Sequence, residues 1–232
     1  MGDIVSGVIH SLEITNEFNI VQQTQAGAYV IAEAVRELAQ IFPKVKIYGI
    51  AGNHGRTKQE KEAYNKQTLS WDYVLYTNLA LLLQNVKNVE VIIPQTWYAE
   101  FEVKGHKFFC THGDTLKNGT GSPLNQVVKD ASNWNQIKGS SGKPINYYIT
   151  SHYHQKAETQ TINGFNMMSG CMKGTCTYAQ NQGYWSDPIQ TFFTLGKQGR
   201  KTNLDINVKN QNYIKSRYAY SLNKALSEQF KK

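Results

Sequence analysis

The chain has 232 residues and a formal charge of +8 at neutral pH, and hydrophobic residues make up 40% of it. This is enough for one sizeable core, and no run of about 18 apolar residues offers a membrane span. The N-terminus lacks the charged, apolar and small-residue regions of a signal peptide. We therefore expect a cytoplasmic protein without a membrane partner, folded as a single domain over residues 1–232.

Charge and cysteine content narrow the classes of partner and compartment. The excess of Lys and Arg favours an anionic partner, such as a nucleic-acid backbone or a phosphorylated small molecule. These basic residues are scattered rather than gathered in one stripe. The chain has three cysteines, Cys110, Cys171 and Cys176, without a CxxC pair, so a reducing compartment would leave them as thiols.

Helical and strand patterns alternate over the first 154 residues. Apolar positions three and four apart over 23–42 predict a helix that Pro43 ends, and residues 45–51 predict a strand covered on both sides. A second helix is expected over about 68–85. Further strands are expected at 89–94, 98–103, 107–112 and 146–152, with a weaker helix near 124–137.

Beyond His154 the pattern changes to short polar-aromatic runs separated by Gly and Asn. These runs predict antiparallel strands at 156–162, 165–169, 189–195 and 203–208. A final helix is expected over 213–230. The layout is that of a mixed α/β fold.

Residues of types that can bind metal ions follow the ends of predicted strands. They are Asp3, Asn53, His112, His152 and His154. Because strands in one layer bring their C-terminal ends together, such residues can converge from distant parts of the sequence. Their nitrogen and oxygen atoms bind divalent cations at about 2.0–2.2 Å. In a regular strand the two histidines of "SHYH" would point to opposite faces, but a turn beginning there can direct them to neighbouring ions.

Four short motifs, in this order, resemble those of the calcineurin-like metallophosphoesterases. They are "GDIVSG" (2–7), "GNHGR" (52–56), "THGD" (111–114) and "SHYH" (151–154). The resemblance extends over residues 2–154 and is strongest to the repair-nuclease and phage-type branch of the family. It implies a β-sandwich flanked by helices, in four α/β/β/α layers, and a phosphoesterase that hydrolyses its substrate through a metal-activated water.

The resemblance also implies the metal ligands. Asp3 would bridge two divalent ions, which could be manganese, zinc or iron. Asn53, His112 and His152 would complete one site, and His154 would belong to the other. The amide oxygen of Asn53 is a neutral ligand, so it would preserve positive charge for an anionic substrate.

Two further residues of the second motif would act on the substrate. By the same resemblance, His54 would protonate the leaving oxygen and Arg56 would steady the phosphate charge. The family often has an acid after this histidine, where Gly55 stands here, and a second acid where Ser6 stands. His106 lies outside every motif and is interpreted as an ordinary residue.

The family's first motif, Asp-x-His on the first strand, does not occur in this sequence, which begins at Met1. We expect a truncated N-terminus or a misassigned start, with the first strand missing and one metal site reduced to Asp3 and His154. Two hypotheses stay open. One is an enzyme that hydrolyses phosphodiesters, with nucleic acid favoured by the charge, or phosphomonoesters. The other is a catalytically silent or split protein with a single intact metal site, which acts in binding or assembly, as an oligomer or with a complementing N-terminal segment.

Overall fold

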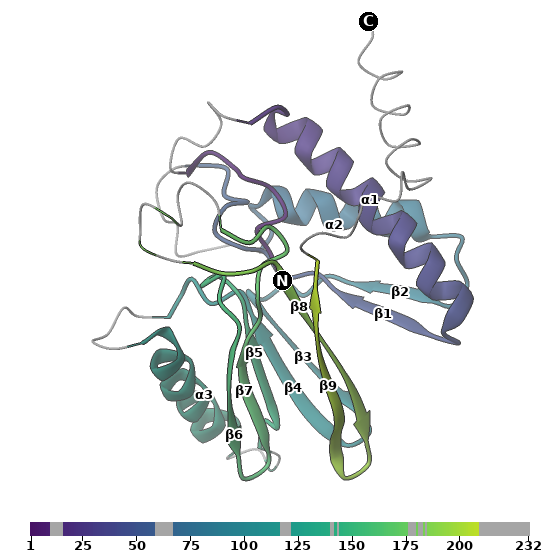
Figure 1. Cartoon of the computed structure of the whole chain (residues 1–232). Helices are drawn as coiled ribbons and strands as arrows, with labels where there is room; N and C mark the ends of the chain where they lie inside the picture. Colours follow the sequence, from purple (N-terminus) through teal and green to yellow (C-terminus); the bar gives the residue numbers. More distant parts are fainter. Residues whose placement is uncertain are drawn as a thin grey trace, which may run out of the picture. The chain divides into compact units, whose positions relative to one another are not determined.

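The computed structural model describes residues 1–9, 16–58, 67–116, 122–139, 142, 144–175, 180, 183 and 185–208. The helix expected over 213–230 and Cys176 lie outside the described residues. The described chain forms two compact units, of which the first is Met1–Trp97 and the second begins at Tyr98 (Figure 1). The single domain expected over residues 1–232 stays a prediction.

The first unit contains two helices and a two-stranded parallel sheet. Its elements are α1 (Ile20–Ile41), β1 (Val45–Tyr48), α2 (Trp71–Leu83) and β2 (Val89–Ile92). Strands β1 and β2 pair in parallel register, with Val45 opposite Val89 and Tyr48 opposite Ile92. Helix α2 connects them in sequence, as expected for parallel neighbours.

Helix α1 begins earlier than its apolar pattern because Asn19 caps it. The side chain of Asn19 accepts a hydrogen bond from the backbone N–H of Gln22, and the Gln22 side chain accepts one from the N–H of Asn19. This reciprocal arrangement satisfies two backbone donors at the start of the helix. The helix ends before Pro43, as predicted, and the preceding Phe42 is already extended.

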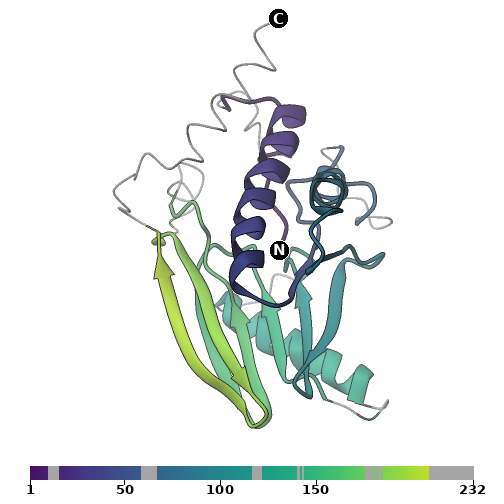
Figure 2. The same cartoon turned by 90° about the vertical axis from the view of Figure 1, so that its right-hand side faces the viewer.

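The two helices pack against each other and against the sheet. Figure 2 shows α1 as the long purple helix. Two clusters of buried apolar side chains result, namely Val5, Ala28, Leu75 and Tyr76, and Ala32, Val35, Leu79 and Leu83. Strand β1 is shorter than the predicted 45–51 and is not covered on both sides. Its Lys46 is exposed and forms a 3.1 Å ion pair with Glu90 of β2.

The second unit is built on a five-stranded mixed sheet in the order β3-β4-β5-β7-β6. Its strands are β3 (Tyr98–Val103), β4 (His106–Thr111), β5 (Tyr147–Thr150), β6 (Ala157–Thr161) and β7 (Gly164–Met168). Helix α3 (Pro123–Gly139) connects β4 to β5, which are parallel. Strand β7 is antiparallel to β6, as predicted for this region, but it also pairs in parallel with β5. The expected mixed α/β class is confirmed.

The faces of this sheet carry different layers because side chains alternate along its strands. Phe109 and Tyr148 pack on one face with α3. On the other face Phe108 and Tyr147 stack with ring centroids 4.6 Å apart, and both stack on Phe193. Phe193 belongs to the antiparallel hairpin of β8 (Ile189–Gly196) and β9 (Gly199–Asn207). The second unit therefore has a helix, a sheet and a hairpin in layers.

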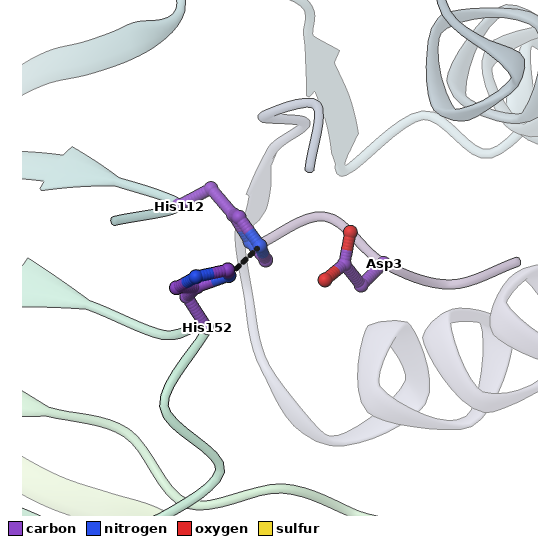
Figure 3. A group of neighbouring side chains, drawn as sticks. All are labelled: Asp3, His112 and His152. Carbon is purple, nitrogen blue, oxygen red and sulfur yellow. Dashed lines mark hydrogen bonds between the residues drawn. The ribbon is translucent and has the colours of Figure 1, made fainter. Parts of the chain in front are cut away.

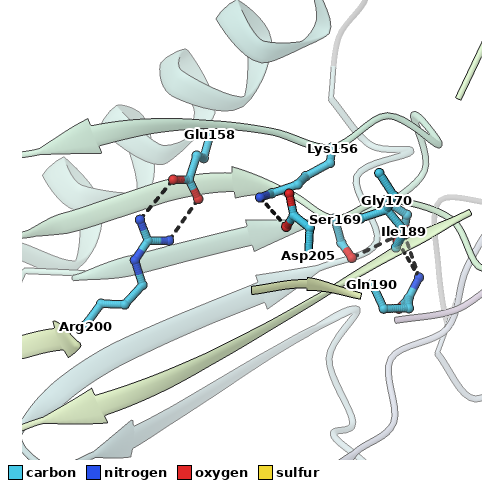
Figure 4. Close-up of polar contacts among 8 residues, drawn as sticks. All are labelled: Lys156, Glu158, Ser169, Gly170, Ile189, Gln190, Arg200 and Asp205. Carbon is cyan, nitrogen blue, oxygen red and sulfur yellow. Dashed lines mark hydrogen bonds and ion pairs between the residues drawn. The ribbon is translucent and has the colours of Figure 1, made fainter. Parts of the chain in front are cut away.

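Two ion pairs connect this hairpin to the rest of the second unit, one to Glu158 of β6 and one to Lys156, the residue just before β6 (Figure 4). Arg200 donates two hydrogen bonds of 2.9 Å to the Glu158 carboxylate, and its guanidinium lies 3.5 Å from the centre of the Phe165 ring. Lys156 pairs with Asp205. The hydrogen bond from Arg200 lowers the pKa of Glu158.

In the described ranges no helix combines the length and apolar character needed to cross a bilayer.

Candidate metal centre

Two histidines lie at the carboxyl ends of neighbouring strands in the second unit. His112 directly follows β4, and His152 follows β5 after one intervening residue. Because β4 and β5 are parallel and hydrogen-bonded, their carboxyl ends lie together. The Nδ1 atom of His152 lies 3.3 Å from Nε2 of His112, with the rings edge to face (Figure 3). The structure thus brings these two predicted residues together.

The spacing of the two nitrogens fits a shared metal ion. Nitrogen ligands at about 2.0–2.1 Å from a tetrahedral ion are about 3.3–3.4 Å from each other, and the observed separation is 3.3 Å. His112 is 1% exposed, so its ring is shielded from competing water. One nitrogen from each ring could therefore serve as a ligand to a divalent cation.

The chain turns sharply after β5, so of the two arrangements considered for "SHYH" it adopts the turn and not the regular strand. His152 and His154 have φ angles of 68° and 59°, in the left-handed region that residues other than glycine rarely adopt. Ser151 continues the sheet by donating its N–H to the carbonyl of His112 at 2.9 Å. The turn therefore ends the alternation of side chains at Ser151. The role of His154 as a ligand of a second ion stays a prediction.

In the first unit, Asp3 lies against the loop that follows β1. Its Oδ1 accepts a 2.8 Å hydrogen bond from the backbone N–H of His54. A Cβ atom on Gly52 would lie 2.1 Å from the same oxygen, so a side chain at that position is excluded. The first two motifs, 2–7 and 52–56, are thus in direct contact. Figure 3 draws the Asp3 carboxylate as well as the two histidine rings.

The backbone orients the His54 ring. Its Nδ1 lies 2.8 Å from the carbonyl oxygen of Ser6. Because a carbonyl can only accept, Nδ1 carries the proton, and Nε2 is the nitrogen that could exchange a proton with a substrate. The sequence has no acid at Gly55 or Ser6 to orient this ring, and the Ser6 carbonyl does so instead.

The other two predicted residues of this loop have different environments. Asn53 is 5% exposed, and Arg56 is half-buried. Arg56 also pairs with Ser70 in an isolated antiparallel bridge, which fixes the backbone at the end of the loop. Their roles, as a metal ligand and as a phosphate contact, stay predictions.

Sequence reasoning missed three buried polar side chains that fix this loop from the α2 side. Gln67 accepts the N–H of Ala51 and donates to the carbonyl of Gly49, both at 2.9 Å. Asp72 accepts the N–H of Gly52 at 2.8 Å. Tyr76 donates to the carbonyl of Ile50 at 3.0 Å, and burial raises its pKa.

A signal for one of these residues was present in the sequence. Asp72 precedes Leu75 and Tyr76 by three and four positions, which places a carboxylate on the apolar face of the predicted helix. A charged side chain on such a face requires hydrogen-bonding partners, so it indicates a polar site beneath the helix.

Comparisons with known proteins found likeness among solved structures alone. No protein-family model matches the sequence, and no curated protein matches it. The chain is similar to a Thermotoga maritima protein solved by NMR, with TM-score 0.37 and 10% identity, covering 88% of this chain and 96% of that one. It is also similar to a conserved Streptococcus pneumoniae TIGR4 protein described as a predicted phosphoesterase, with TM-score 0.36 and 9% identity, covering 78% and 90%.

A third similar structure is Vps29 from Entamoeba histolytica in complex with Zn²⁺, with TM-score 0.34 and 11% identity, covering 70% of this chain and 98% of that one. These likenesses concern the fold alone, and none of them gives this chain an activity.

Proposed function

We propose that this chain is a divalent-metal-dependent phosphoesterase. The observation that carries the proposal is the His112–His152 pair, with facing ring nitrogens 3.3 Å apart at the ends of two parallel strands. In the proposed centre Asp3 and Asn53 supply oxygen ligands to the same ion, and His154 belongs to a second ion. Nitrogen and oxygen ligands of this kind suit zinc, manganese and iron.

In the second motif, His54 and Arg56 act on the substrate. When bound, divalent ions neutralise phosphate oxygens and activate a water molecule for attack on phosphorus. As the bond from phosphorus to the leaving oxygen breaks, a His54 ring protonated on both nitrogens gives its Nε2 proton to that oxygen and becomes neutral. Nδ1 stays on the Ser6 carbonyl at 2.8 Å, which keeps the ring oriented. Arg56 pairs with phosphate oxygens through its planar guanidinium.

The first test compares two histidines of the second unit. His112→Ala should lose manganese or zinc uptake at pH 7.5, together with hydrolysis of bis-p-nitrophenyl phosphate. His106→Ala is the matched control because His106 lies at the start of β4, at the opposite end of the strand from His112, where its Nε2 lies 3.1 Å from the Lys197 carbonyl oxygen. Equal metal uptake by wild type and His112→Ala would remove His112 from the ligands.

A second variant separates proton transfer from metal binding. His54→Ala should keep the metal stoichiometry and lower turnover by about 10²–10⁴-fold, as expected for loss of a general acid. If this variant loses metal to the same extent as His112→Ala, His54 is not the acid. Metal binding by the wild type without turnover of any diester or monoester would favour a catalytically silent protein that acts in binding or assembly.

For the substrate class we propose phosphodiesters, including nucleic acid, on the basis of the +8 formal charge. The wild type should hydrolyse bis-p-nitrophenyl phosphate faster than p-nitrophenyl phosphate. Its affinity for single-stranded DNA should fall steeply with salt, because basic residues that neutralise phosphates release counterions. Faster hydrolysis of the monoester, with DNA affinity insensitive to salt, would favour a small phosphomonoester substrate.

A further inference from the structure

The carboxylate of Asp72 lies at the junction of two segments that carry proposed site residues. Its Oδ2 accepts the backbone N–H of Gly52 at 2.8 Å and that of Asp3 at 3.1 Å, and its Oδ1 accepts the N–H of Ile4 at 3.3 Å. The Asp72 side chain is fully buried. One buried carboxylate therefore ties residues 3–4 to residue 52.

Tyr76, one helical turn further along α2, reinforces this junction. Its hydroxyl accepts the N–H of Gly2 at 3.3 Å and donates to the carbonyl of Ile50 at 3.0 Å. Asp72 and Tyr76, which we call the α2 clamp, thus connect the same two segments at two successive points. The bonded groups include the N–H of Asp3 itself and that of Gly52, the residue before Asn53.

The loop leaves room for this clamp at Gly55. A Cβ atom at Gly55 would lie 2.5 Å from Oγ of Ser70 and 2.9 Å from Oδ2 of Asp72. Ser70 also caps α2 by accepting the N–H of Asp72 at 3.1 Å, which fixes the start of the helix. The carboxylate that supports this loop therefore comes from the helix, and a larger residue at Gly55 would displace it.

We propose that the α2 clamp consists of positioning residues for the metal centre. Asp72 in particular holds Asp3, whose φ is +55°, and the backbone before Asn53 in the arrangement in which both can bind an ion. This inference rests on the proposed function, because it assigns Asp3 and Asn53 as ligands. It predicts that weakening the clamp lowers metal affinity although no direct ligand is changed.

The main test is Asp72→Asn, with Asp130→Asn as the matched control. An asparagine keeps the size of the side chain but turns an NH₂ group toward at least one of the three backbone N–H donors. Asp130 is also a helical aspartate that accepts a hydrogen bond, from the Tyr148 hydroxyl, but it lies in the second unit on α3. The dissociation constant for Mn²⁺, measured by calorimetry on metal-free protein, should rise about 10–100-fold for Asp72→Asn. It should be unchanged for Asp130→Asn.

A second readout separates positioning from general destabilisation. If Asp72 positions ligands, excess Mn²⁺ should restore most of the turnover of folded Asp72→Asn, so that the midpoint of activation shifts along with the dissociation constant. A folded variant with wild-type affinity for Mn²⁺ would overturn the inference while leaving the proposed function intact. Absence of Mn²⁺, Zn²⁺ and Fe²⁺ binding by the wild type would overturn both.

The hydroxyl of Tyr76 offers an independent route if Asp72→Asn does not fold. Tyr76→Phe keeps the ring in its cluster and removes the bonds to Gly2 and Ile50, so Mn²⁺ affinity should fall several-fold. Tyr148→Phe is its control because it also removes one buried hydroxyl, in the second unit. Equal Mn²⁺ affinities of the two variants would refute a positioning role for the clamp.

Discussion

The Gln67 side chain forms the hydrogen bonds to residues 49–51 that a neighbouring strand would otherwise form. Replacing Gln67 by leucine tests how much these bonds contribute to stability. The Gln67 amide pairs with the N–H of Ala51 and the carbonyl of Gly49, as a parallel backbone would. Gln67 is 2% exposed, and Gly49 and Ala51 are buried. Water therefore cannot replace the two hydrogen bonds when the amide is removed.

The expected cost follows from these two bonds. A buried backbone group left without a partner costs about 1–3 kcal/mol, so two such groups cost about 2–6 kcal/mol. Burial of the apolar leucine side chain returns about 1 kcal/mol. The free energy of unfolding should therefore fall by about 1–5 kcal/mol. At a urea m-value of roughly 2 kcal/mol/M, the midpoint should shift by about 0.5 M or more.

Urea unfolding followed by circular dichroism measures this shift, with Gln84→Leu as the control. Gln84 is the exposed residue at the end of α2, and its substitution should change the midpoint little. Because residues 49–51 lead directly into Asn53 and His54, Gln67→Leu should also weaken Mn²⁺ binding. A midpoint for Gln67→Leu within about 0.2 M of that of Gln84→Leu would refute the reasoning.

Three further predictions concern the second unit. Phe109→Ala should lower the free energy of unfolding by about 3–5 kcal/mol, because Phe109 is fully buried and stacks on Tyr98, and urea unfolding measures this loss. Burial raises the pKa of Cys110 to about 12, so its thiol should not react with a disulfide reagent in the native protein at pH 8. One fewer fast-reacting thiol in Cys110→Ala would contradict this. Because Arg200 lowers the pKa of Glu158, the pair stabilises the fold above the ordinary carboxyl pKa, and this contribution is lost as the pH falls through the lowered pKa. Glu158→Gln should therefore destabilise the protein by about 0.5–1 kcal/mol at pH 7 and by much less near pH 3, and a gap that persists in acid would rule the pair out as its cause.

Strands were predictable where their pattern is local. The predicted strand at 98–103 coincides with β3, and β4 follows after a two-residue turn. Lys104 and Gly105 form this turn with φ angles of 51° and 86°, which suits the twist of a hairpin. The parallel pairing of β5 with β7 was not predictable, because it depends on which strands become neighbours and not on their own sequences.

In the candidate site, too, some features were predictable from the sequence and others were not. The meeting of His112 and His152 followed from their positions just after two strands, once those strands were parallel neighbours. The bond from His54 to the Ser6 carbonyl has no signature in the sequence, because every residue carries a carbonyl. Likewise, apolar spacing placed α2 but did not reveal that Gln67 and Asp72 bind backbone groups at sequence separations of 16 to 69 residues.

The four-residue spacing between Asp72 and Tyr76 also sets a rule for comparing this chain with new homologous sequences. Residues four apart on a helix share a face, and one inserted residue would rotate the second by about 100° away from Gly2 and Ile50. Homologues that retain this junction should therefore tolerate substitutions of the residues that lie between these two positions, but no insertion or deletion there. An alignment with a gap there would identify a protein that supports its loops by other means.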